Sequence, residues 1–237
     1  MTNRFEDRLV LIAGGTGGLG EAVSLAFLNE GAKVAVTYRT EAEFQDLRAA
    51  TATGVLSGYQ VDVTDEAAVS RFSQKLVVEF GVPYAVVNAV GGYAGGTKLW
   101  ELDPKVLEKM MALNLTAGFL LLRAIVPAML KRNRGAIVSI ASRAAVDHAG
   151  AAAAYVASKA AAVAMIDSLA EDLKGTGVRA NSVLPSIIDT PVNRQAMPNA
   201  DFSKWPKAED IAKVILFLCS DDAALIHGAS IPVYGNL

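Results

Sequence analysis

The stretch of sequence that decides the fold is Leu9-Val10-Leu11-Ile12-Ala13-Gly14-Gly15-Thr16-Gly17-Gly18-Leu19-Gly20. Its first five residues form an apolar run typical of a buried strand, and helical periodicity begins at Gly18. A glycine-rich turn between a first strand and a helix lets the backbone approach a pyrophosphate, whose charge lies at the helix N-terminus. We therefore interpret this stretch as a dinucleotide-binding turn, although its Gly-x-x-x-Gly-x-Gly spacing differs from the commoner Gly-x-Gly-x-x-Gly form. Its predicted cofactor-binding residues are Gly14, Thr16, Gly18, Leu19 and Gly20.

Beyond this turn, strand-like runs alternate with helical stretches along the chain. The strand candidates are 9–13, 33–38, 57–61, 84–87, 136–140, 178–183 and 230–233. Helical periodicity fits 18–29, 41–50, 66–80, 113–131, 152–174 and 207–220. Continuous apolar strands separated by helices indicate a parallel sheet that is covered on both faces, with right-handed crossovers. We predict an α/β, doubly wound, mostly parallel seven-stranded sheet of the Rossmann type, with 1–237 as a single domain.

The composition excludes several classes of protein. Of the 237 residues, 52% are hydrophobic and 19% are charged, which suits one large core. A net charge of -2 gives no reason to expect nucleic acid. The single cysteine, Cys219, excludes an internal disulfide and a cysteine-based metal site, and we expect no metal. Arg123 and Asp167 interrupt the longest apolar runs, and the start of the chain is too charged for a signal peptide. We expect a soluble cytoplasmic protein with no membrane contact.

Two of the predicted helices are too apolar for ordinary surface helices. The helix at 113–131 is apolar nearly all round, and the helix at 152–174 contains an uncharged stretch at 160–166. A helix that is apolar on every side is buried on every side. Because one side of each helix faces the sheet, we expect the other side to meet a second subunit, in a homodimer or homotetramer. The alternative is a thick core under long loops.

A tyrosine and a lysine occur with the spacing of one helical turn, in Tyr155-Val156-Ala157-Ser158-Lys159. Positions i and i+4 share a helix face, so both side chains can point into one pocket. An ammonium near a phenol favours the phenolate and lowers its pKa, which suits proton transfer near neutral pH. Ser142, thirteen residues upstream of the tyrosine, can hold a substrate oxygen beside it. Taken alone, such a pair more often just covers a helix surface.

The end of the second strand bears on the choice of cofactor. An NAD site usually places an acidic residue here to bind the adenosine ribose, but no acid occurs before Glu41. Arg39 can instead pair with a 2′-phosphate through two hydrogen bonds. We therefore favour NADP(H), with NAD(H) as the alternative.

With these residues in place, the chain resembles the short-chain dehydrogenase/reductase family over nearly its whole length. Each matching motif alone is weak evidence for the family. All of them occur in the order found in the family, and this makes the set specific. In chain order the motifs are the turn at Gly14/Gly18/Gly20, Asp62-Val63, Asn88, Asn114, Ser142, Tyr155 with Lys159, and Asn181 with Pro185 to Thr190. The resemblance implies cofactor contacts from Asp62 and Val63 to adenine, from Asn88 and Ala89 along the groove, and from Pro185, Ile188 and Thr190 near the nicotinamide carboxamide.

The resemblance also implies four catalytic roles. Tyr155 would be the general acid that protonates a carbonyl oxygen during reduction. Lys159 would bind the nicotinamide ribose and lower the pKa of the tyrosine. Ser142 would fix the substrate oxygen, and Asn114 would support a proton-relay water near the lysine. The chain departs from the family pattern at Asn88-Ala89-Val90-Gly91, Ser186 and Tyr234, and only the first puts a loop's hydrogen bonding in doubt.

A narrower resemblance bears on the substrate. The segment 189–205 and the glycine-flanked Tyr93 look like the corresponding parts of dihydropteridine reductases, which would place Tyr93 against a flat heterocycle. Ser142 and Arg39 are untypical of those enzymes. The segment 190–207 is a predicted short substrate lid, and Arg143 and His148 are further candidate substrate residues, with solvated loop positions as the alternative for both.

The leading hypothesis is therefore an NADP(H)-dependent oxidoreductase that moves a hydride between nicotinamide and a small carbonyl or alcohol substrate. The alternatives within enzymes are quinonoid dihydropteridine reduction and 3-oxoacyl thioester reduction. A protein that senses the dinucleotide without turnover is a weaker hypothesis, because such proteins often lose the tyrosine or the lysine and this chain keeps both.

Overall fold

The computed structural model describes residues 3–51 and 54–236 and contains one seven-stranded sheet, with strand order β3-β2-β1-β4-β5-β6-β7. Every neighbouring pair is parallel. The strands are β1 (Leu9–Ala13), β2 (Lys33–Tyr38), β3 (Val55–Gln60), β4 (Ala85–Asn88), β5 (Gly135–Ile140), β6 (Val178–Pro185) and β7 (Ser230–Val233). This confirms the predicted Rossmann-type fold, with shifts of one or two residues at some strand ends. Residues 1, 2, 52, 53 and 237 of the predicted domain lie outside the described residues.

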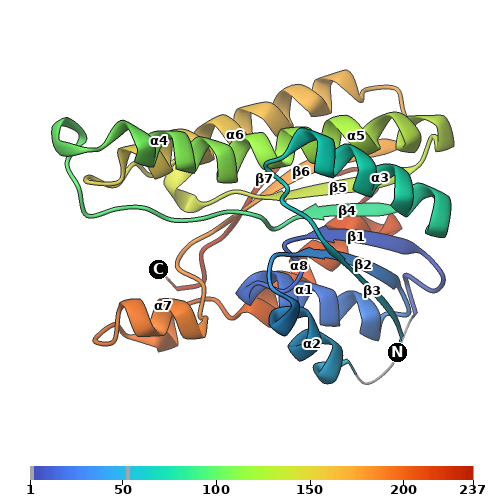
Figure 1. Cartoon of the computed structure of the whole chain (residues 1–237), viewed down its shortest axis with the longest axis horizontal. Helices are drawn as coiled ribbons and strands as arrows, with labels where there is room; N and C mark the ends of the chain where they lie inside the picture. The colour runs from blue at the N-terminus through green and yellow to red at the C-terminus, as the bar shows by residue number, and fades with distance from the viewer. Residues whose placement is uncertain (1–2, 52–53, 237) are drawn as a thin grey trace.

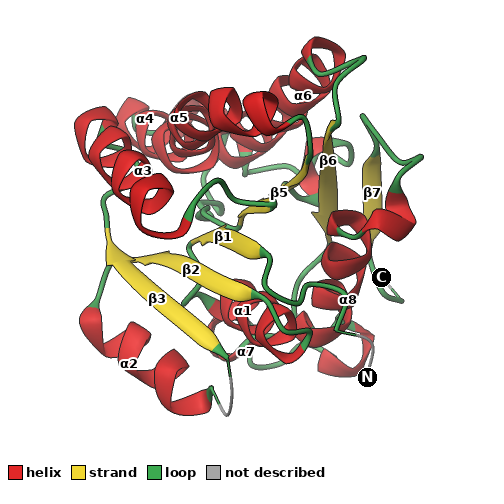
Figure 2. Ribbon diagram, turned by 90° about the vertical axis from the view of Figure 1, so that its right-hand side faces the viewer, coloured by secondary structure: helices red, strands yellow, loops and turns green. Residues whose placement is uncertain are grey.

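Helices cover both faces of the sheet (Figure 1, Figure 2). The longer ones are α1 (Gly18–Asn29), α2 (Glu41–Ala50), α3 (Glu66–Phe80), α4 (Pro104–Met111), α5 (Ala117–Arg132), α6 (Ala153–Asp172) and α8 (Ala208–Cys219), and α7 (Pro191–Ala196) is short. One core cluster joins the sheet to α1, α2 and α8, and a second joins it to α3, α5 and α6. The α/β layers therefore bury both faces of the sheet, as its continuous apolar strands require.

The region before α5 differs from the predicted single helix at 113–131. An additional helix, α4, begins at Pro104, where Asp103 caps it by accepting a hydrogen bond from the Lys105 amide. A π-helical turn, Ala112–Thr116, then joins α4 to α5. Helix α4 was missed because it has only eight residues, about two turns, which is too short for a helical period to stand out in the sequence. The π turn contains the buried Asn114, consistent with the tendency of such turns to occur at functional sites.

Two helical stretches, Pro104–Arg132 and Ala153–Asp172, are long and apolar enough by length and composition to cross a membrane. Helices that pack in a protein core can have the same length and apolar composition. Here α5 and α6 contribute buried residues to the core cluster on one face of the sheet, so we interpret both stretches as core helices.

The sheet has a topological switch point between β1 and β4, which are neighbours although β2 and β3 separate them in the chain. Crossovers from these two strands leave in opposite directions, so their carboxyl ends border a crevice. The glycine-rich turn follows β1, and the Asn88-Ala89-Val90-Gly91 turn follows β4. The fold thus brings two of the quoted motifs to one edge of the sheet.

Candidate active site

The turn after β1 is held in a compact form that leaves little room for side chains. Gly14 has a φ of +72°, and its amide donates a 3.0 Å hydrogen bond to the Thr37 hydroxyl at the end of β2. A Cβ on Gly15 would lie 2.4 Å from Val36, and one on Gly20 would lie 2.0 Å from the Gly14 carbonyl oxygen. Helix α1 then begins without a side-chain cap, so its first amides remain available to an anion.

The turn after β4 packs directly against this glycine-rich turn. The Ala89 amide donates to the Ala13 carbonyl at 3.0 Å, and Val90 lies 3.2 Å from the point a Cβ on Gly14 would occupy. Asn88 is 3% exposed, and its Oδ1 accepts a hydrogen bond from the Val90 amide. The Asn88 side chain therefore shapes the turn from within the fold, and a direct contact between it and a cofactor stays a prediction.

The end of β6 reaches the same crevice from the other side. Pro185 is the last residue of this strand, and Ile188 packs against the core behind the turn. A Cβ on Gly18 would lie 3.0 Å from the methyl group of Thr190, so the two residues face each other closely. Thr190 also caps α7 by accepting a hydrogen bond from the Asn193 amide. The first residues of the 190–207 segment are thus anchored beside the N-terminus of α1.

Arg39 and Asp62 lie near each other at the ends of β2 and β3. Arg39 is exposed, and its backbone carbonyl oxygen accepts a hydrogen bond of 2.8 Å from the side-chain nitrogen of Gln60. Hydrogen bonds from Thr64 to the Asp62 carboxylate hold its pKa below the usual value, and the positive charge of Arg39 acts in the same direction. Val63, next to the carboxylate, is half-buried. This corner therefore combines a cation, an anion and an apolar side chain, a set suited to an adenosine group.

An acid that sequence reasoning did not single out also reaches this corner. The Thr16 hydroxyl donates a hydrogen bond of 3.3 Å to the carboxylate of Glu43, on the first turn of α2. Leu19, in the first turn of α1, is 8% exposed and belongs to the core. The glycine-rich turn thus has a carboxylate on one side and Arg39 beyond it.

Tyr155 lies in the first turn of α6, partly buried, beside Ser142. Burial raises the pKa of the Tyr155 phenol, while a hydrogen bond with the Ser142 side chain acts in the opposite direction. The ammonium of Lys159 does not contribute to this shift in the arrangement seen here, and the lowering of the phenol's pKa by the lysine stays a prediction. Desolvation dominates the shift, and the lysine side chain is engaged elsewhere.

Lys159 is 5% exposed, and its ammonium donates a 3.0 Å hydrogen bond to the carbonyl oxygen of Ile140, the last residue of β5. Burial lowers the pKa of Lys159 to about 8. Sequence reasoning placed the lysine on the correct helix face, but it could not identify the backbone carbonyl as its partner. A buried amine with a pKa near 8 exchanges protons readily at neutral pH, which is typical of functional lysines.

Asn114 is 3% exposed and connects three parts of the site. Its side chain accepts a 2.8 Å hydrogen bond from the Gly92 amide and donates one of 3.0 Å to the Gly92 carbonyl oxygen. It also donates at 2.9 Å to the hydroxyl of Ser158, whose own hydroxyl donates to the Tyr155 carbonyl oxygen. Ser158 was not predicted as a site residue, although it lies within the Tyr155–Lys159 stretch.

Gly91 completes this arrangement because it has no side chain. A Cβ at this position would lie 2.9 Å from Asn114 Oδ1 and 3.0 Å from Lys159 Nζ. Both distances are shorter than ordinary van der Waals contacts, so even an alanine would displace one of the two polar groups. The Asn114 and Lys159 side chains thus lie against a turn that departs from the family pattern at Ala89 and Val90.

Tyr93 lies against Tyr155. Its ring lies edge-on to that of Tyr155, with centroids 5.0 Å apart, and 72% of the residue is exposed. His148 is exposed on its loop, and no hydrogen bond or ion pair joins it to another site residue in 3–51 and 54–236. The structure therefore supports a substrate contact for Tyr93 more directly than for His148.

Arg143 contacts two residues: Asp147 in its own loop and Tyr234 near the C-terminus. Its guanidinium pairs with the Asp147 carboxylate at 2.8 Å and lies over the ring of Tyr234, 5.3 Å from the centroid. The Tyr234 carbonyl oxygen accepts a 2.7 Å hydrogen bond from the Ser186 hydroxyl. Ser186 and Tyr234, the two positions near the C-terminal part of the site that depart from the family pattern, therefore contact each other. Through Arg143 they support the loop that follows Ser142.

Known proteins resemble this chain over its whole length. The family model of short chain dehydrogenases matches residues 8–201. The 2-(S)-hydroxypropyl-CoM dehydrogenase 3 of Xanthobacter autotrophicus is 33% identical, and the match covers 100% of this chain and 99% of that protein. The 3-oxoacyl-[acyl-carrier-protein] reductase FabG of Thermotoga maritima is 29% identical, with 99% of each chain covered.

Solved structures also resemble this chain over nearly its whole length. ElxO with NADP bound is 28% identical, with a TM-score of 0.89 over 96% of this chain and 97% of that one. The NAD⁺-bound xylitol dehydrogenase, at 24% identity, has a TM-score of 0.91 over 98% and 99% and shows the shared fold. These relatives bind different nicotinamide dinucleotides, so the likeness alone does not select one. The chain belongs to the short-chain dehydrogenase/reductase family, whose enzymes bind a nicotinamide dinucleotide and act on alcohol or carbonyl groups.

Proposed function

We propose that this protein is an NADP(H)-dependent oxidoreductase that interconverts a small carbonyl compound and its alcohol. The observation that carries the proposal is the packing of Asn114 and Lys159 around the Gly91-Gly92 backbone, together with Ser142 beside Tyr155 on the helix that carries the lysine. This arrangement provides two hydroxyl groups for one substrate oxygen and a buried amine behind them. Alcohol and carbonyl interconversion needs such an acid–base group next to the hydride carrier.

The residues present fit a dinucleotide. A pyrophosphate would lie at the uncapped N-terminus of α1, where the glycines leave no side chain in the way. Asp62 and Val63 would hold the adenine, Ala89 would line the groove, and Ile188 and Thr190 would contact the nicotinamide carboxamide. When bound, the nicotinamide supplies or accepts the hydride.

The protein's own groups then handle the proton. The Ser142 and Tyr155 hydroxyls would both donate hydrogen bonds to the substrate carbonyl oxygen, and Tyr155 would transfer its proton to that oxygen during reduction. For Lys159 to lower the pKa of the phenol, its ammonium has to extend from the Ile140 carbonyl toward the tyrosine. Lys159 would then supply a proton to the Tyr155 phenolate, and Asn114 would orient a water that returns a proton to the lysine. In the oxidation direction the same steps run in reverse.

Two charged residues bear on the choice between NADP(H) and NAD(H). Arg39 is exposed at the end of β2, where a 2′-phosphate would lie, and it supports NADP(H). Glu43, hydrogen-bonded to Thr16, carries a negative charge into the same region and favours the ribose hydroxyls of NAD(H). We propose that the arginine dominates, because a guanidinium makes two charge-assisted hydrogen bonds to a phosphate.

The resemblance of 189–205 to dihydropteridine reductases supports a second candidate activity, and the exposed ring of Tyr93 beside Tyr155 favours it specifically. A 3-oxoacyl thioester reductase is a further candidate, supported by the likeness to a FabG enzyme. A protein that binds the dinucleotide without turnover is the weakest candidate, because it would have no use for the four-residue arrangement.

The proposed assembly is a homodimer or homotetramer, formed through the outer sides of α5 and α6. Phe119 supports this proposal because it lies on α5 with 48% of its surface exposed. The 190–207 segment, with α7 anchored at Thr190, would cover the substrate as a short lid. We further propose that the protein works in the cytoplasm on a small-molecule substrate.

The direct test is to follow NADPH and NADH oxidation with small diketones, an acetoacetyl thioester and quinonoid dihydropterin. We expect reduction of the diketones, faster with NADPH. Turnover of the pterin alone would establish the second candidate in place of the first. Binding of dinucleotide without turnover of any substrate would support the sensing role instead.

A further inference from the structure

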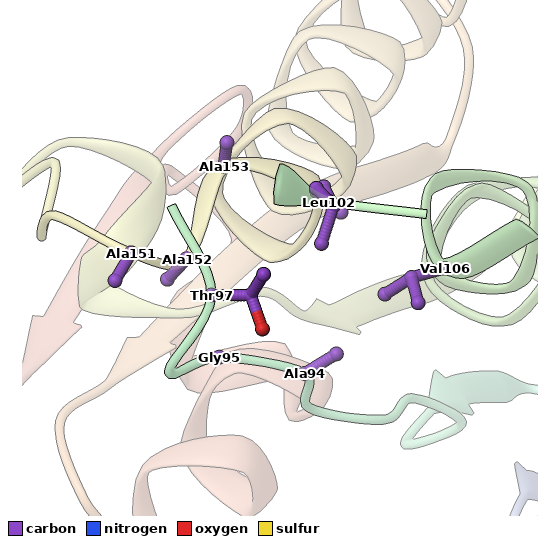
Figure 3. Close-up of a pocket in the computed structure, with 9 residues that line it drawn as sticks. Ala94, Gly95, Thr97, Leu102, Val106, Ala151, Ala152 and Ala153 are labelled. Carbon is purple, nitrogen blue, oxygen red and sulfur yellow. The ribbon is translucent and has the colours of Figure 1, made fainter. Parts of the chain in front are cut away.

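A cavity of about 150 Å³ lies at the start of α6 (Figure 3). Its walls come from three segments: the loop after β4, the beginning of α4, and residues 151–154. Leu102 and Val106 supply the two largest side chains, and the remaining lining is alanine, glycine and Thr97. The Thr97 hydroxyl is the one polar side-chain group among the nine lining residues. The cavity is therefore small, apolar and uncharged.

The cavity is connected to the catalytic tyrosine through Tyr93. Ala154, in its wall, directly precedes Tyr155 in the chain. A Cβ on Gly95, another wall residue, would lie 2.1 Å from the Tyr93 hydroxyl oxygen, so the Tyr93 ring lies against Gly95. The same ring contacts Tyr155 edge-on at 5.0 Å. Tyr93 thus lies against both the catalytic phenol and one wall of the cavity.

The loop that carries Tyr93 is held by hydrogen bonds on both sides of this residue, because Asn114 binds the backbone of Gly92 before it. The Gly96 amide donates a 2.8 Å hydrogen bond to the Ala151 carbonyl oxygen, which fixes the loop to the start of α6. The Tyr93 ring contacts Tyr155 and Gly95 on one side, yet 72% of the residue is exposed. The exposed part of this ring is therefore available to contact a substrate group beside Tyr155 and the cavity wall.

The volume of the cavity limits what it can hold. Pockets that enclose a whole ligand commonly measure roughly 300–1,000 Å³. An apolar cavity of about 150 Å³ holds a benzene ring. The present cavity has that volume, so it accommodates one ring or one branched alkyl group of a larger substrate. A pterin bicycle, which carries several hydrogen-bonding nitrogens, would be too large and would meet only the Thr97 hydroxyl.

We infer that this cavity receives the apolar substituent of the carbonyl substrate, namely a phenyl ring or a compact branched alkyl group; the inference rests on the proposed function. With the substrate oxygen held by Ser142 and Tyr155, one substituent enters the cavity and Tyr93 packs against its face. Burial of a phenyl-sized group stabilises the complex by about 2 kcal/mol, or roughly thirtyfold in affinity. The enzyme therefore prefers a phenyl ketone over the corresponding methyl ketone.

A filling substitution tests this preference. The substrates are 2,3-butanedione, 1-phenyl-1,2-propanedione and the naphthyl analogue of the latter. In the wild type we expect kcat/KM to be at least tenfold higher for the phenyl diketone than for 2,3-butanedione. For the naphthyl diketone, kcat/KM should be lower than for the phenyl diketone. Val106→Phe should lower the phenyl-to-methyl ratio at least tenfold while leaving butanedione reduction within threefold. Leu107→Phe, on the exposed neighbour in α4, is the matched control and should leave the ratio unchanged.

A binding measurement separates this inference from the proposed reaction. Binding of fluorobenzene, followed by fluorine NMR, should be saturable in Tyr155→Phe and should be lost in Tyr155→Phe/Val106→Phe. Val106→Leu should give an intermediate effect if Val106→Phe folds poorly. Non-saturable binding, binding that Val106→Phe leaves intact, or an unchanged phenyl-to-methyl ratio would each overturn the cavity assignment. Val106-dependent binding without reduction of any diketone would support the apolar site and overturn the carbonyl chemistry.

Discussion

The ammonium of Lys159 donates a hydrogen bond of 3.0 Å to the carbonyl oxygen of Ile140. This contact connects α6 to the end of β5 and keeps the lysine inside the protein, where burial lowers its pKa to about 8. The phenol of Tyr155, on the same helix, has a raised pKa because burial also penalises its charged form. The phenol and the ammonium are thus on one helix face, while the lysine's hydrogen bond goes to the sheet.

The burial of Lys159 has a measurable cost in stability. The pKa of Lys159 is about 8 in the native state and 10.5 in the unfolded chain. Between these two values the unfolded chain binds more protons than the native state, so the stability lost by burying the lysine decreases as pH rises through that range. Without added cofactor, Lys159→Met should therefore be more stable than the wild type at pH 7, by at most about 3 kcal/mol. The difference should shrink toward pH 10.5.

Urea unfolding of both proteins at pH 7, 8, 9 and 10 measures this difference, and the contributions of other titrating groups largely cancel in it. Lys109→Met, on an exposed position of α4, is the control and should show no pH-dependent difference. A difference that stayed constant across this range would mean that the lysine is not desolvated in the native state.

Gly91→Ala should damage catalysis without removing a catalytic group. The added methyl would lie about 3 Å from both the Asn114 amide oxygen and the Lys159 ammonium, so one of them has to move. Displacements of about 1 Å in an active site cost up to about 100-fold in rate, and we expect kcat to fall between about 10- and 100-fold.

The control for this substitution is Gly150→Ala, because no atom lies within 4 Å of its added Cβ and its backbone is unstrained for alanine. Both proteins should bind NADPH within about threefold of the wild type. Equal kcat values for the two variants would show that the Gly91 turn does not control the positions of Asn114 and Lys159.

Cofactor preference should respond in opposite directions to substitutions at Arg39 and Glu43. Arg39→Ala should lower kcat/KM for NADPH by about 10- to 100-fold, since charge-assisted hydrogen bonds contribute roughly 1.5–3 kcal/mol, and should change the value for NADH little. Glu43→Gln should raise kcat/KM for NADPH a few-fold by removing a negative charge near the 2′-phosphate. Arg48→Ala, on the far end of α2, is the control. If Arg39→Ala retained the NADPH preference, another group would have to recognise the phosphate.

The ion pair between Arg143 and Asp147 should limit any attraction of the site for anions. Asp147→Asn leaves the guanidinium uncompensated, and about 1 kcal/mol of added attraction corresponds to about fivefold in affinity. We therefore expect kcat/KM for a keto acid, relative to the neutral methyl ketone, to rise about fivefold and to lose this gain at 1 M salt. Arg143→Gln should show no such gain. An unchanged ratio in Asp147→Asn would place Arg143 outside the substrate site and leave it a support for the Ser142 loop.

The strands and most helices could be predicted from the sequence because their apolar periods are continuous over whole elements, as at β1 and α1. Helix α4 could not, because its eight residues span only about two turns and are too few for a period to be recognised. The four catalytic candidates were found by their spacing and by family likeness. The lysine's partner, the Asn114–Ser158 bond and the Ser186–Tyr234 contact were not, since each depends on segments brought together by the sheet.

The sign of the pKa shift of Tyr155 illustrates the same limit. Helical spacing correctly places a phenol and an ammonium on one face, and Coulomb attraction alone would lower the phenol's pKa. Whether that attraction exceeds desolvation depends on burial and on the rotamer of a long side chain. Neither quantity can be read from the order of residues.

The central claim is that Tyr155 is the acid–base group of a carbonyl reduction, and the most direct measurement uses Tyr155→Phe. Removal of one hydroxyl should lower kcat by at least about 10³-fold, within the range attributed to general acid catalysis. The dissociation constant for NADPH, measured by its fluorescence, should stay within about threefold of the wild-type value. A Tyr155→Phe enzyme with an undiminished rate and intact cofactor binding would contradict the account.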